Sequence, residues 1–459
     1  MVDVILVNPR SEGALRRPLR SDLTKKMKII TPLFLIITLA VMVMTLPVEA
    51  SSSQNYWQPL PTGPISRIAF GSCAKQWQHQ PIWHTVIVAK PVLFLFLGDA
   101  IYADTDGTTA WEVTEQQLEG EWNRLADKPE FQKARAAIPM MATWDNHDYG
   151  THDGGVEFPL KEQSQTIFLD FFAEPAESKR RNTPGIYDAK IFGPQGRRVQ
   201  IILLDTRFFK DRYKKDPTPK AKRLKSGKVG GYLPDDDPKK TLLGDEQWRW
   251  LREQLKKPAV VRLIASSIQI IPDKKGMDEW GNFPRERKKL FDLIGSTGAK
   301  GVILLTGNVH FAELSKSKTA GYPFFEFTSS GMTHVNEVYA KATNEYRIAG
   351  PFIHRNVGLV EIDWERTPSP LITLKVIGED GRTGFSHSVR LDELQTSQVT
   401  GKQETVPCPE PRLQVCTQDY RPVCAVRQDG SYKTYANGCS ACSDPEVTGY
   451  LEGTCEGVK

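Results

Sequence analysis

The distribution of cysteines constrains this 459-residue chain more than any other feature. Six of its seven cysteines lie between Cys408 and Cys455, and only Cys73 lies elsewhere. Cysteines this dense are typical of a small disulfide-bonded unit in an oxidising compartment, whereas the preceding chain is long enough to bury its own core. The polar segment 394–407 indicates an exposed linker. We therefore predict a large domain over residues 51–395, a linker over 396–407 and a disulfide-rich domain over 408–455.

The N-terminal segment has the order of a secretory signal peptide. The mostly apolar run 29–46 follows a lysine-rich segment and precedes small residues and serines. We therefore predict a signal peptide over residues 1–50, with Met27 as an alternative start. An uncleaved anchor is the other interpretation, because the run is close to the shortest length that spans a bilayer. The protein is expected to be secreted or extracytoplasmic. If the peptide is cleaved, we expect no stable membrane insertion; if it is not cleaved, the N-terminal segment anchors the protein.

Composition and hydrophobic periodicity predict an α/β fold for the large domain. The hydrophobic (39%) and charged (25%) fractions are those of an ordinary globular protein, and a net charge of +5 predicts no nucleic-acid binding beyond a substrate. The spacing of Trp248, Leu251 and Leu255 predicts a helix over 244–256, and 283–294 is a second helix candidate. Apolar runs predict strands at 68–70, 92–97, 138–143, 199–204, 260–265, 302–305, 324–328, 357–362 and 371–376.

Polar clusters follow four of these predicted strands. The clusters occupy residues 71–73, 98–104, 144–148 and 307–310. Ligands of α/β sheets bind beyond the carboxyl ends of the strands, so the clusters can converge on one site. Their carboxylate, imidazole, phenol and thiol groups are metal ligands. Taken singly, each has a structural alternative: Cys73 as a small buried residue, Asp99 as a loop cap, His310 as a core histidine and 145–148 as an exposed polar loop.

In combination, these motifs resemble the alkaline phosphatase D (PhoD-like) branch of the metallophosphatases. The resemblance covers most of residues 67–315, and its motifs lie at 70–73, 97–102, 144–150, 203–207 and 307–310. It implies a metallophosphatase-like β-sandwich flanked by helices, a metal cluster, and hydrolysis of phosphate mono- or diesters outside the cytosol.

The resemblance also implies a set of metal ligands. Cys73, Asp99 and Tyr102 match ligands of a ferric ion (Fe3+), and Asp99 is expected to bridge to a second metal. Asn146 matches a ligand of that second metal, which is calcium (Ca2+) in bacterial relatives. Another divalent metal is the alternative.

Three further residues match groups that act near the phosphate. His147 corresponds to a histidine that orients or protonates the phosphate ester, and His310 to a residue that contacts metal or phosphate, which we place with the metal ligands. Arg207 lies in a shared motif, where an arginine can neutralise the transferring phosphoryl group. Asp205 is a further candidate, or else it anchors Arg207 through a bidentate ion pair.

The sequence departs from the family pattern at several positions. The last motif usually reads Gly-Asp-Val-His, whereas this chain has Asn308, which removes one negative charge from the site. Asp145 and Asn146 stand where many relatives have two aspartates, so either residue can be the ligand, and Asp148 is a further candidate. The extra N-terminal β-domain of some relatives is not expected.

The segment 210–228 is strongly basic. It contains nine Lys or Arg residues and only two acidic ones, together with prolines and a glycine. Because it directly follows Arg207, it could attract an anionic substrate or a polyanionic surface. A solvated insertion is the alternative.

The C-terminal cysteines resemble the framework of a Kazal-type inhibitor. The stretch 416–424 and the sequence Tyr-Ala-Asn-Gly-Cys at 435–439 carry the resemblance. It implies that Gln418 enters the specificity pocket of a protease. Glutamine, however, suits neither a trypsin-like pocket nor a large apolar one. A role as a stable cap or adhesion module is therefore the alternative. The implied partner is a protease or another extracellular molecule. The implied disulfides are Cys408 with Cys442, Cys416 with Cys439, and Cys424 with Cys455.

Two functions are therefore open. The first is a secreted metal-dependent phosphoesterase that carries an accessory Kazal-like module. The second is a secreted protease inhibitor or binding protein whose phosphatase-like domain is inactive. The near-complete ligand set favours the enzyme.

Overall fold

The computed structural model describes residues 57–319, 321–395, 405–412, 415–416 and 419–455. The predicted signal peptide over 1–50, with its alternative start at Met27, lies outside the described residues, as do Gln418 and most of the predicted linker. Within the described part of the chain, no helix combines the length and the apolarity that crossing a membrane requires.

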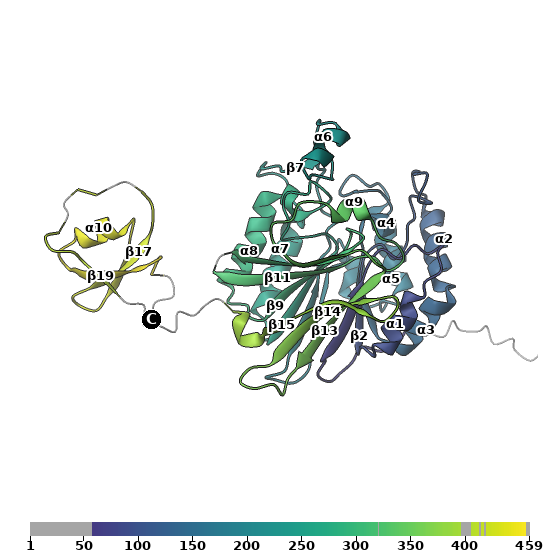
Figure 1. Cartoon of the computed structure of the whole chain (residues 1–459), viewed down its shortest axis with the longest axis horizontal. Coiled ribbons are helices and arrows are strands. Elements are labelled where there is room, and N and C mark those ends of the chain that lie inside the picture. Colours follow the sequence, from purple (N-terminus) through teal and green to yellow (C-terminus); the bar gives the residue numbers. More distant parts are fainter. Residues whose placement is uncertain (1–56, 320, 396–404, 413–414, 417–418, 456–459) are drawn as a thin grey trace, which may run out of the picture. The chain divides into compact units, whose positions relative to one another are not determined.

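The large domain is built on two β-sheets (Figure 1). The first sheet has six strands, in the order β15 (Thr383–Arg390), β14 (Leu371–Gly378), β13 (Asn356–Asp363), β1 (Arg67–Gly71), β2 (Leu93–Leu97) and β3 (Met140–Thr143). The second has seven, in the order β12 (Arg347–Phe352), β10 (Ala312–Thr319), β11 (Tyr322–Ser329), β9 (Val302–Thr306), β8 (Val261–Ser266), β5 (Val199–Leu203) and β4 (Asp188–Phe192). Strands β1, β2 and β3 run parallel, and so do β5, β8 and β9.

Side chains of the central strands alternate between two buried faces, which explains their continuous apolar sequences. In β2, the three leucines pack between the two sheets, whereas Phe94 and Phe96 pack on the outer face. In β9, Ile303 and Leu305 join the layer between the sheets, and Leu304 packs on the opposite side. Each sheet is therefore covered on both faces.

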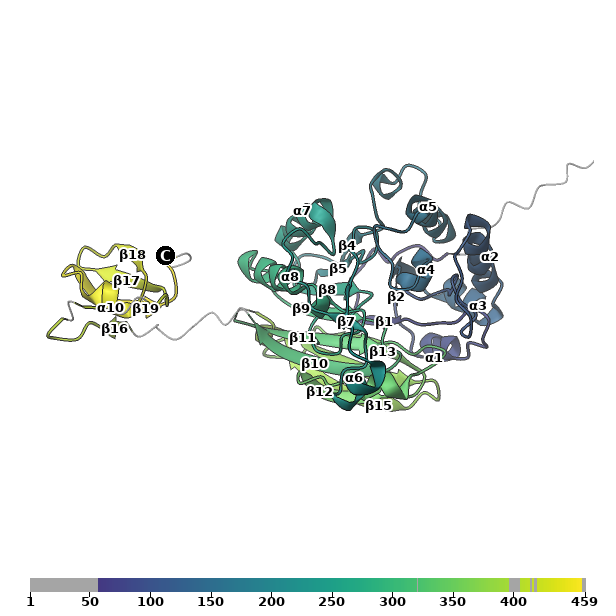
Figure 2. The ribbon, with the colours of Figure 1, turned by 90° about the horizontal axis from the view of Figure 1, so that it is seen from above.

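Helices cover the outer faces of the sheets (Figure 2). Beside the first sheet lie α1 (Ile82–Val88), α2 (Glu115–Ala126), α3 (Pro129–Ala137), α4 (Asn146–Tyr149) and α5 (Lys161–Phe171). Against the second lie α7 (Gly244–Lys256) and α8 (Pro284–Ser296), whose Trp248, Leu251 and Leu290 pack with strand residues. Shorter elements are α6 (Lys220–Lys225), α9 (Glu337–Ala340), β6 (Lys214–Lys215), β7 (Tyr232–Leu233) and the 3-10 turns Lys179–Asn182, Trp280–Asn282 and Leu391–Glu393.

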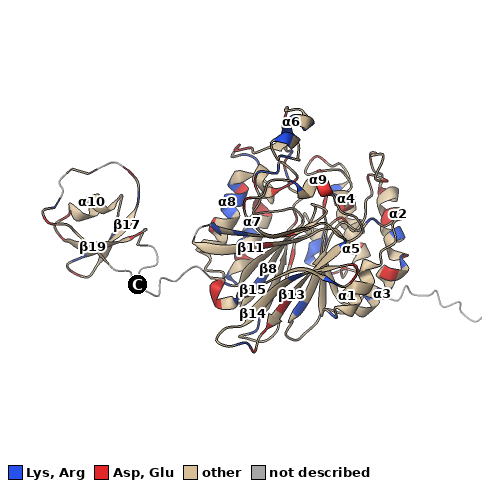
Figure 3. Ribbon diagram, in the orientation of Figure 1, with Lys and Arg blue, Asp and Glu red and all other residues tan. Residues whose placement is uncertain are grey.

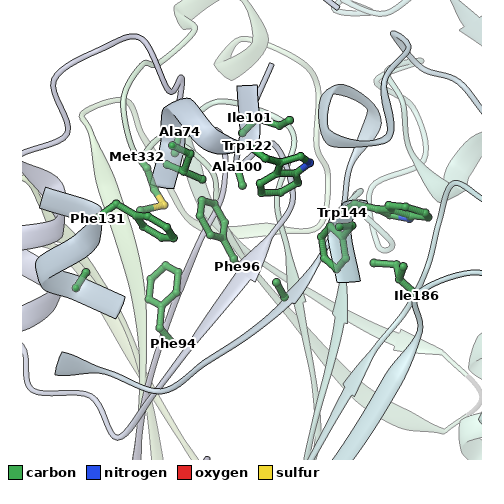
Figure 4. Packing of buried hydrophobic residues seen from close by; sticks show 14 of the residues in the cluster. Ala74, Phe94, Phe96, Ala100, Ile101, Trp122, Phe131, Trp144, Ile186 and Met332 are labelled. Atoms are coloured by element: carbon green, nitrogen blue, oxygen red, sulfur yellow. The ribbon is translucent and has the colours of Figure 1, made fainter. Parts of the chain in front are cut away.

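Aromatic side chains dominate the core between the first sheet and its helices (Figure 4). Phe94 and Phe96 of β2 pack with Trp83 of α1, with ring centroids 5.0 and 5.7 Å apart. Trp144 follows β3, and its ring centroid lies 5.6 Å from that of Phe168 in α5. This packing fixes the ends of β2 and β3, from which the candidate site residues project.

The predicted fold class is confirmed: the large domain is an α/β sandwich of two sheets flanked by helices. The helix predicted over 244–256 has these bounds, and every predicted strand is present. The strand predicted over 138–143 is shorter, because Ile138 is the C-cap of α3 and β3 begins at Met140. The helices α1, α2, α3 and α5 were not predicted.

The sequence indicates an exposed segment over 394–407, and described residues at both ends of this segment belong to folded domains. The N-terminal end agrees with the predicted bounds of the large domain, 51–395, whereas the C-terminal end differs from the predicted linker, 396–407. Leu394 is buried between the sheets, and its carbonyl accepts hydrogen bonds from the amide of Gly301 (2.6 Å) and the hydroxyl of Tyr322 (2.8 Å). Val406 and Pro407 form β16 and pair with β19 of the small domain. The large domain therefore includes Leu394, and the small domain begins before Cys408.

The small domain is a four-stranded sheet with one short helix. Its elements are β16 (Val406–Pro407), β17 (Val423–Arg427), β18 (Tyr432–Tyr435), α10 (Gly438–Cys442) and β19 (Val447–Glu452). Its disulfides are Cys408–Cys442, Cys416–Cys439 and Cys424–Cys455. This is the pairing that the sequence resemblance implied. A core of Val423, Ala425, Ala441 and Val447 is small, so the disulfides supply much of the stability.

Candidate metal centre

The loops that follow the parallel strands of both sheets meet at one end of the sandwich. Cys73 follows β1, Asp99 follows β2 and His310 follows β9. One ligand atom from each of these three residues lies within 4.8 Å of the other two. The convergence that the sequence predicted is therefore present, and it combines the two sheets.

The backbone at this site is unusual. Cys73 (φ 63°), Asp99 (φ 50°), Asn308 (φ 69°) and His310 (φ 59°) all have left-handed conformations. Residues other than glycine adopt this region at a cost, and such positions cluster at functional sites. The surrounding contacts hold the strained turns. For example, the amide of His310 donates to Ser330 Oγ at 2.9 Å, and Ser330 Oγ lies 3.1 Å from Cys73 Sγ.

Cys73, Asp99 and Tyr102 form a compact buried group. Asp99 Oδ2 lies 3.4 Å from Cys73 Sγ and 3.3 Å from the Tyr102 hydroxyl. Burial, followed by the repulsion of Asp145 and Asp148, raises the pKa of Asp99 well above its usual value. Burial and Asp99 also raise the pKa of Cys73 and of Tyr102. Such a crowded acidic group suits a bound cation, which would favour the ionised forms.

Two of the buried oxygens that lack a hydrogen-bond partner among the described residues belong to the segment after β3. They are Asp145 Oδ2 and Asn146 Oδ1. Buried polar atoms are rarely left unpaired, and oxygens of this kind are ligands for hard cations. The other oxygen of Asp145 accepts from Ser267 and Arg207. Both residues that the sequence left as alternatives therefore offer an oxygen, and the residues present fit a metal centre. Because this segment is buried, the alternative of an exposed loop is wrong.

His147 is oriented by a carboxylate that the sequence had not assigned a role. Its Nδ1 lies 2.5 Å from Asp104 Oδ1, and its ring packs 4.2 Å from the ring of Tyr102, centroid to centroid. The side chain of His147 is 12% exposed, whereas that of Asp104 is 4% exposed. Since Asp104 engages Nδ1, Nε2 is the nitrogen available to a ligand.

Arg207 was predicted to neutralise the transferring phosphoryl group, but it is not among the residues that line the cavity beside the candidate metal centre. Its side chain is fully buried, and its guanidinium bridges Asp145 and Asp278, with Nε 2.8 Å from Asp145 Oδ1. Asp205 does not pair with this guanidinium, so the bidentate alternative is wrong. Its Oδ1 instead accepts the amide of Arg207 at 2.8 Å and the indole of Trp144 at 2.8 Å. Arg207 positions the Asp145 carboxylate, and Asp205 holds the loop after β5.

Asp148 has a similar structural role. Its carboxylate accepts the backbone amides of Asp99 (2.5 Å), Asp145 (2.9 Å) and Ile101 (3.0 Å). These contacts join the loops after β2 and β3, although burial still raises the pKa of Asp148 to about 7. Asn308 donates from Nδ2 to the Asp278 carbonyl at 3.1 Å, a bond that an aspartate could not donate.

Sequence analysis missed two residues of this site. His334 lies between Tyr102 and His310: its Nε2 is 3.4 Å from the Tyr102 hydroxyl, and its ring centroid is 4.3 Å from that of His310. Asp278 pairs with Arg207 and with the hydroxyl of Tyr213. His334 follows the predicted strand 324–328, so the rule used for the other polar clusters would have found it. Asp278 follows no predicted strand.

A cavity of about 590 Å³ opens beside the metal-ligand group. Asn146, His147, Asn308 and His310 line it, together with residues of the basic segment 210–228. Burial, together with the charges of His147 and Lys75, lowers the pKa of His310 to about 3. A neutral imidazole at this position can serve as a metal ligand but not as a general acid.

Comparisons with known proteins agree with the fold. The family model described as "PhoD-like phosphatase" matches residues 68–356, which is more than half of the chain. Alkaline phosphatase D of Bacillus subtilis (strain 168) is 26% identical over 282 residues, which cover 54% of this chain and 46% of that protein. A solved structure titled "Structure of PhoD" matches with a TM-score of 0.51 and 18% identity, over 72% of this chain and 74% of the other.

The chain thus spans less than half the length of its curated relative. The small domain, with its three disulfides, lies beyond the residues that the family model matches. The strand-end motifs that form the candidate metal centre all lie within the matched range. Because the family model covers more than half of the chain and the fold is shared, the chain belongs to the PhoD-like phosphatase family.

Proposed function

We propose that the large domain is a metal-dependent phosphoesterase that hydrolyses phosphate mono- or diesters. The observation that carries the proposal is the set of ligand atoms of Cys73, Asp99 and His310 within 4.8 Å, beside a cavity that His147 also lines. Family membership supports the same class of reaction. Hydrolysis by in-line displacement needs positive charge around the phosphate and a positioned acid, and this site can supply both.

We assign the residues as two groups of ligands. Cys73, Asp99, Tyr102 and His310 would hold one ion, and the thiol and phenol suit ferric iron. The oxygens of Asn146 and Asp145 would hold the second, and an oxygen donor set suits calcium. When bound, such a pair of cations lowers the pKa of water and neutralises charge on the phosphoryl oxygens.

The remaining chemistry belongs to the protein's own side chains. Asp104 fixes the ring of His147 through Nδ1, so Nε2 can donate a hydrogen bond or a proton to a phosphate or leaving-group oxygen. Arg207 acts indirectly, because its buried guanidinium orients Asp145 and leaves one oxygen of that carboxylate for a ligand.

Metal analysis and turnover test this proposal together. The purified full chain should contain iron and calcium and should hydrolyse p-nitrophenyl phosphate or its bis-ester, and chelation should abolish the activity. A folded protein that binds neither ion and turns over neither ester would instead favour the second function, a binding protein with an inactive phosphatase-like domain.

Cys73→Ser is expected to change the spectrum as well as the rate. A thiolate bound to ferric iron gives a visible charge-transfer band, which this substitution should remove or shift while lowering iron content. Activity should fall by more than about tenfold, because losing a ligand should cost at least as much as losing a residue that only supports one. A colourless wild-type protein without iron, or a fully active and unchanged Cys73→Ser variant, would contradict the ligand assignment.

We further propose that the protein acts outside the cytosol. Disulfides persist in oxidising compartments, and the small domain has three. The apolar segment near the N-terminus would direct export. Mass spectrometry of the mature protein from its native host tests this proposal: a mature N-terminus near residue 51 supports a cleaved signal peptide, whereas an intact N-terminus in the membrane fraction supports the anchor.

We propose that the small domain is Kazal-like. Its disulfide pairing, with one helix packed on a small sheet, supports the assignment. If Gln418 is presented to a protease, Gln418→Lys should improve trypsin binding at least about tenfold by supplying the cation that a trypsin-like pocket accepts. Unchanged inhibition constants for the two proteins would favour a cap or adhesion role.

The two domains are expected to fold independently. A chain ending at Gln395 should keep its activity within about twofold of the full chain, because few contacts usually cross a domain boundary. A chain ending at Glu393 is the matched control. It lacks Leu394, so a buried side chain and two hydrogen bonds are lost and the free energy of unfolding should fall by about 2–4 kcal/mol. Inactivity of the longer fragment would show that the small domain supports the site.

A further inference from the structure

The basic segment beside the cavity is bonded to the large domain at several points. Strand β6 pairs with β7, so the segment between them forms a hairpin-like excursion that contains α6. The amides of Gly230 and Tyr232 donate to the carbonyls of Lys275 (2.9 Å) and Gly276 (3.0 Å). At Gly230 the backbones approach so closely that a Cβ would lie 1.7 Å from the Gly276 carbonyl oxygen. The segment is therefore held against the loop that carries Asp278.

This attachment brings cations to the cavity that His147 and His310 line. Lys215 of β6 and Lys220 and Arg223 of α6 belong to its wall. In Figures 1 and 3, the basic helix α6 and strand β7 lie at the same end of the domain as α4 and α9. Segment 210–228 therefore extends the candidate active site and is not merely a solvated insertion.

The positive charge of these residues is not neutralised by the cavity wall. The three aspartates of the wall are already engaged: Asp216 with Lys228 (2.7 Å), Asp153 with His152 (3.3 Å), and Asp278 with Arg207. Among the described residues, Lys215, Lys220 and Arg223 form no ion pair, and the guanidinium of Arg223 donates to the carbonyl of Thr218, at 2.6 Å.

We propose that this basic wall is a subsite for a second phosphate, so that the preferred substrates are phosphate esters that carry a further phosphate group. The inference rests on the proposed phosphoesterase function, because one phosphate must occupy the metal centre. A second phosphate on the same molecule would then reach Lys215 and Lys220, which line the cavity and have no acidic partner in the described part of the chain. A phosphate ester without a second anion leaves these cations without a ligand.

Equilibrium binding tests the subsite without requiring turnover. Calorimetry on the full chain would compare thymidine phosphorylated on both hydroxyls with thymidine phosphorylated on the primary hydroxyl alone. We expect the bisphosphate to bind about tenfold more tightly, because two to three exposed charge pairs are added, and we expect this advantage to shrink at high salt. Equal affinities for the two compounds would overturn the proposal.

A pair of double variants locates the effect. Lys215→Ala with Lys220→Ala should reduce the preference for the bisphosphate to less than about threefold. Lys214→Ala with Lys222→Ala is the matched control: it removes the same charge from the same segment, but these lysines do not line the cavity, so the preference should persist. A preference that survives the first pair of substitutions, or that is lost equally in the control, would contradict the subsite.

Turnover separates this inference from the proposed function. The p-nitrophenyl ester of thymidine monophosphate would be compared with the same ester bearing a second phosphate on the other hydroxyl. If the protein binds the bisphosphate with the expected preference but hydrolyses neither ester, the phosphoesterase proposal fails and the subsite stands. If it hydrolyses both esters with a ratio of kcat/KM that Lys215→Ala with Lys220→Ala leaves unchanged, the subsite fails and the phosphoesterase stands.

Discussion

Asp99→Asn is expected to lower kcat/KM for p-nitrophenyl phosphate by at least about a thousandfold, which corresponds to about 4 kcal/mol of transition-state stabilisation. Asp99 lies within reach of Cys73, Tyr102 and His310, so its carboxylate is the group best placed to bind the proposed iron and to bridge to a second ion. The asparagine side chain keeps the shape but cannot neutralise a cation. Metal content and steady-state rates would be measured on the same samples.

The fold should survive this substitution. Burial and neighbouring carboxylates disfavour the ionised form of Asp99, so replacing it with a neutral amide does not remove a charge that the metal-free protein needs. Circular dichroism should therefore be unchanged. Asp127→Asn, the same change at an exposed helix end, is the control and should retain full activity. A folded Asp99→Asn protein with normal activity would refute the assignment of the site.

Arg207→Met is expected to be the most destabilising single substitution near the site. Arg207 is fully buried and bridges Asp145 and Asp278, and its removal would leave two buried carboxylates without their cation. Breaking a buried ion pair on one side typically costs about 3–5 kcal/mol. Arg207→Lys should recover part of this loss, because an ammonium keeps the charge but cannot match the two-sided geometry of the guanidinium.

Urea denaturation followed by tryptophan fluorescence measures this effect in the full chain. All ten tryptophans precede the linker, so the signal reports on the large domain alone. Arg252→Met is the matched control, because Arg252 is exposed on α7, and it should change the free energy of unfolding by less than about 0.5 kcal/mol. If Arg207→Met were no more destabilising than Arg252→Met, the structural role assigned to Arg207 would be wrong.

The local sequence was sufficient to predict the strands that build the site. The alternation Leu-Phe-Leu-Phe-Leu in β2 requires two apolar faces, and such a strand is stable only between two layers. The apolar runs that form β1, β2, β3 and β9 each end at a polar cluster, so the positions of the candidate site residues could be predicted from the strand ends. The helices α1 and α3 were missed because they lack a clear helical periodicity and depend on aromatic packing. Trp83 of α1 packs against Phe94 of β2, and Phe131 of α3 packs against Trp83.

Roles within the site depended on partners distant in the sequence. Arg207 and Asp145 are 62 residues apart and Tyr102 and His334 are 232 apart, so no local pattern could pair them. Asp148 and Asp205 have the same residue type as the candidate ligand Asp145, but the folded chain surrounds their oxygens with backbone amides. Whether a buried carboxylate supports a loop or binds a cation depends on which donors the tertiary structure brings to it.

The sequence by itself determined the α/β class, the cysteine-rich second domain and the residue types of the candidate metal centre, because burial and residue chemistry are encoded locally. The two-sheet sandwich was implied by the family resemblance. Only the tertiary structure decided that Arg207 supports Asp145 rather than facing the cavity, that Asp104 orients His147, and that the basic segment lines the same cavity. These outcomes depend on the packing of two sheets against each other, which joins loops from distant parts of the chain.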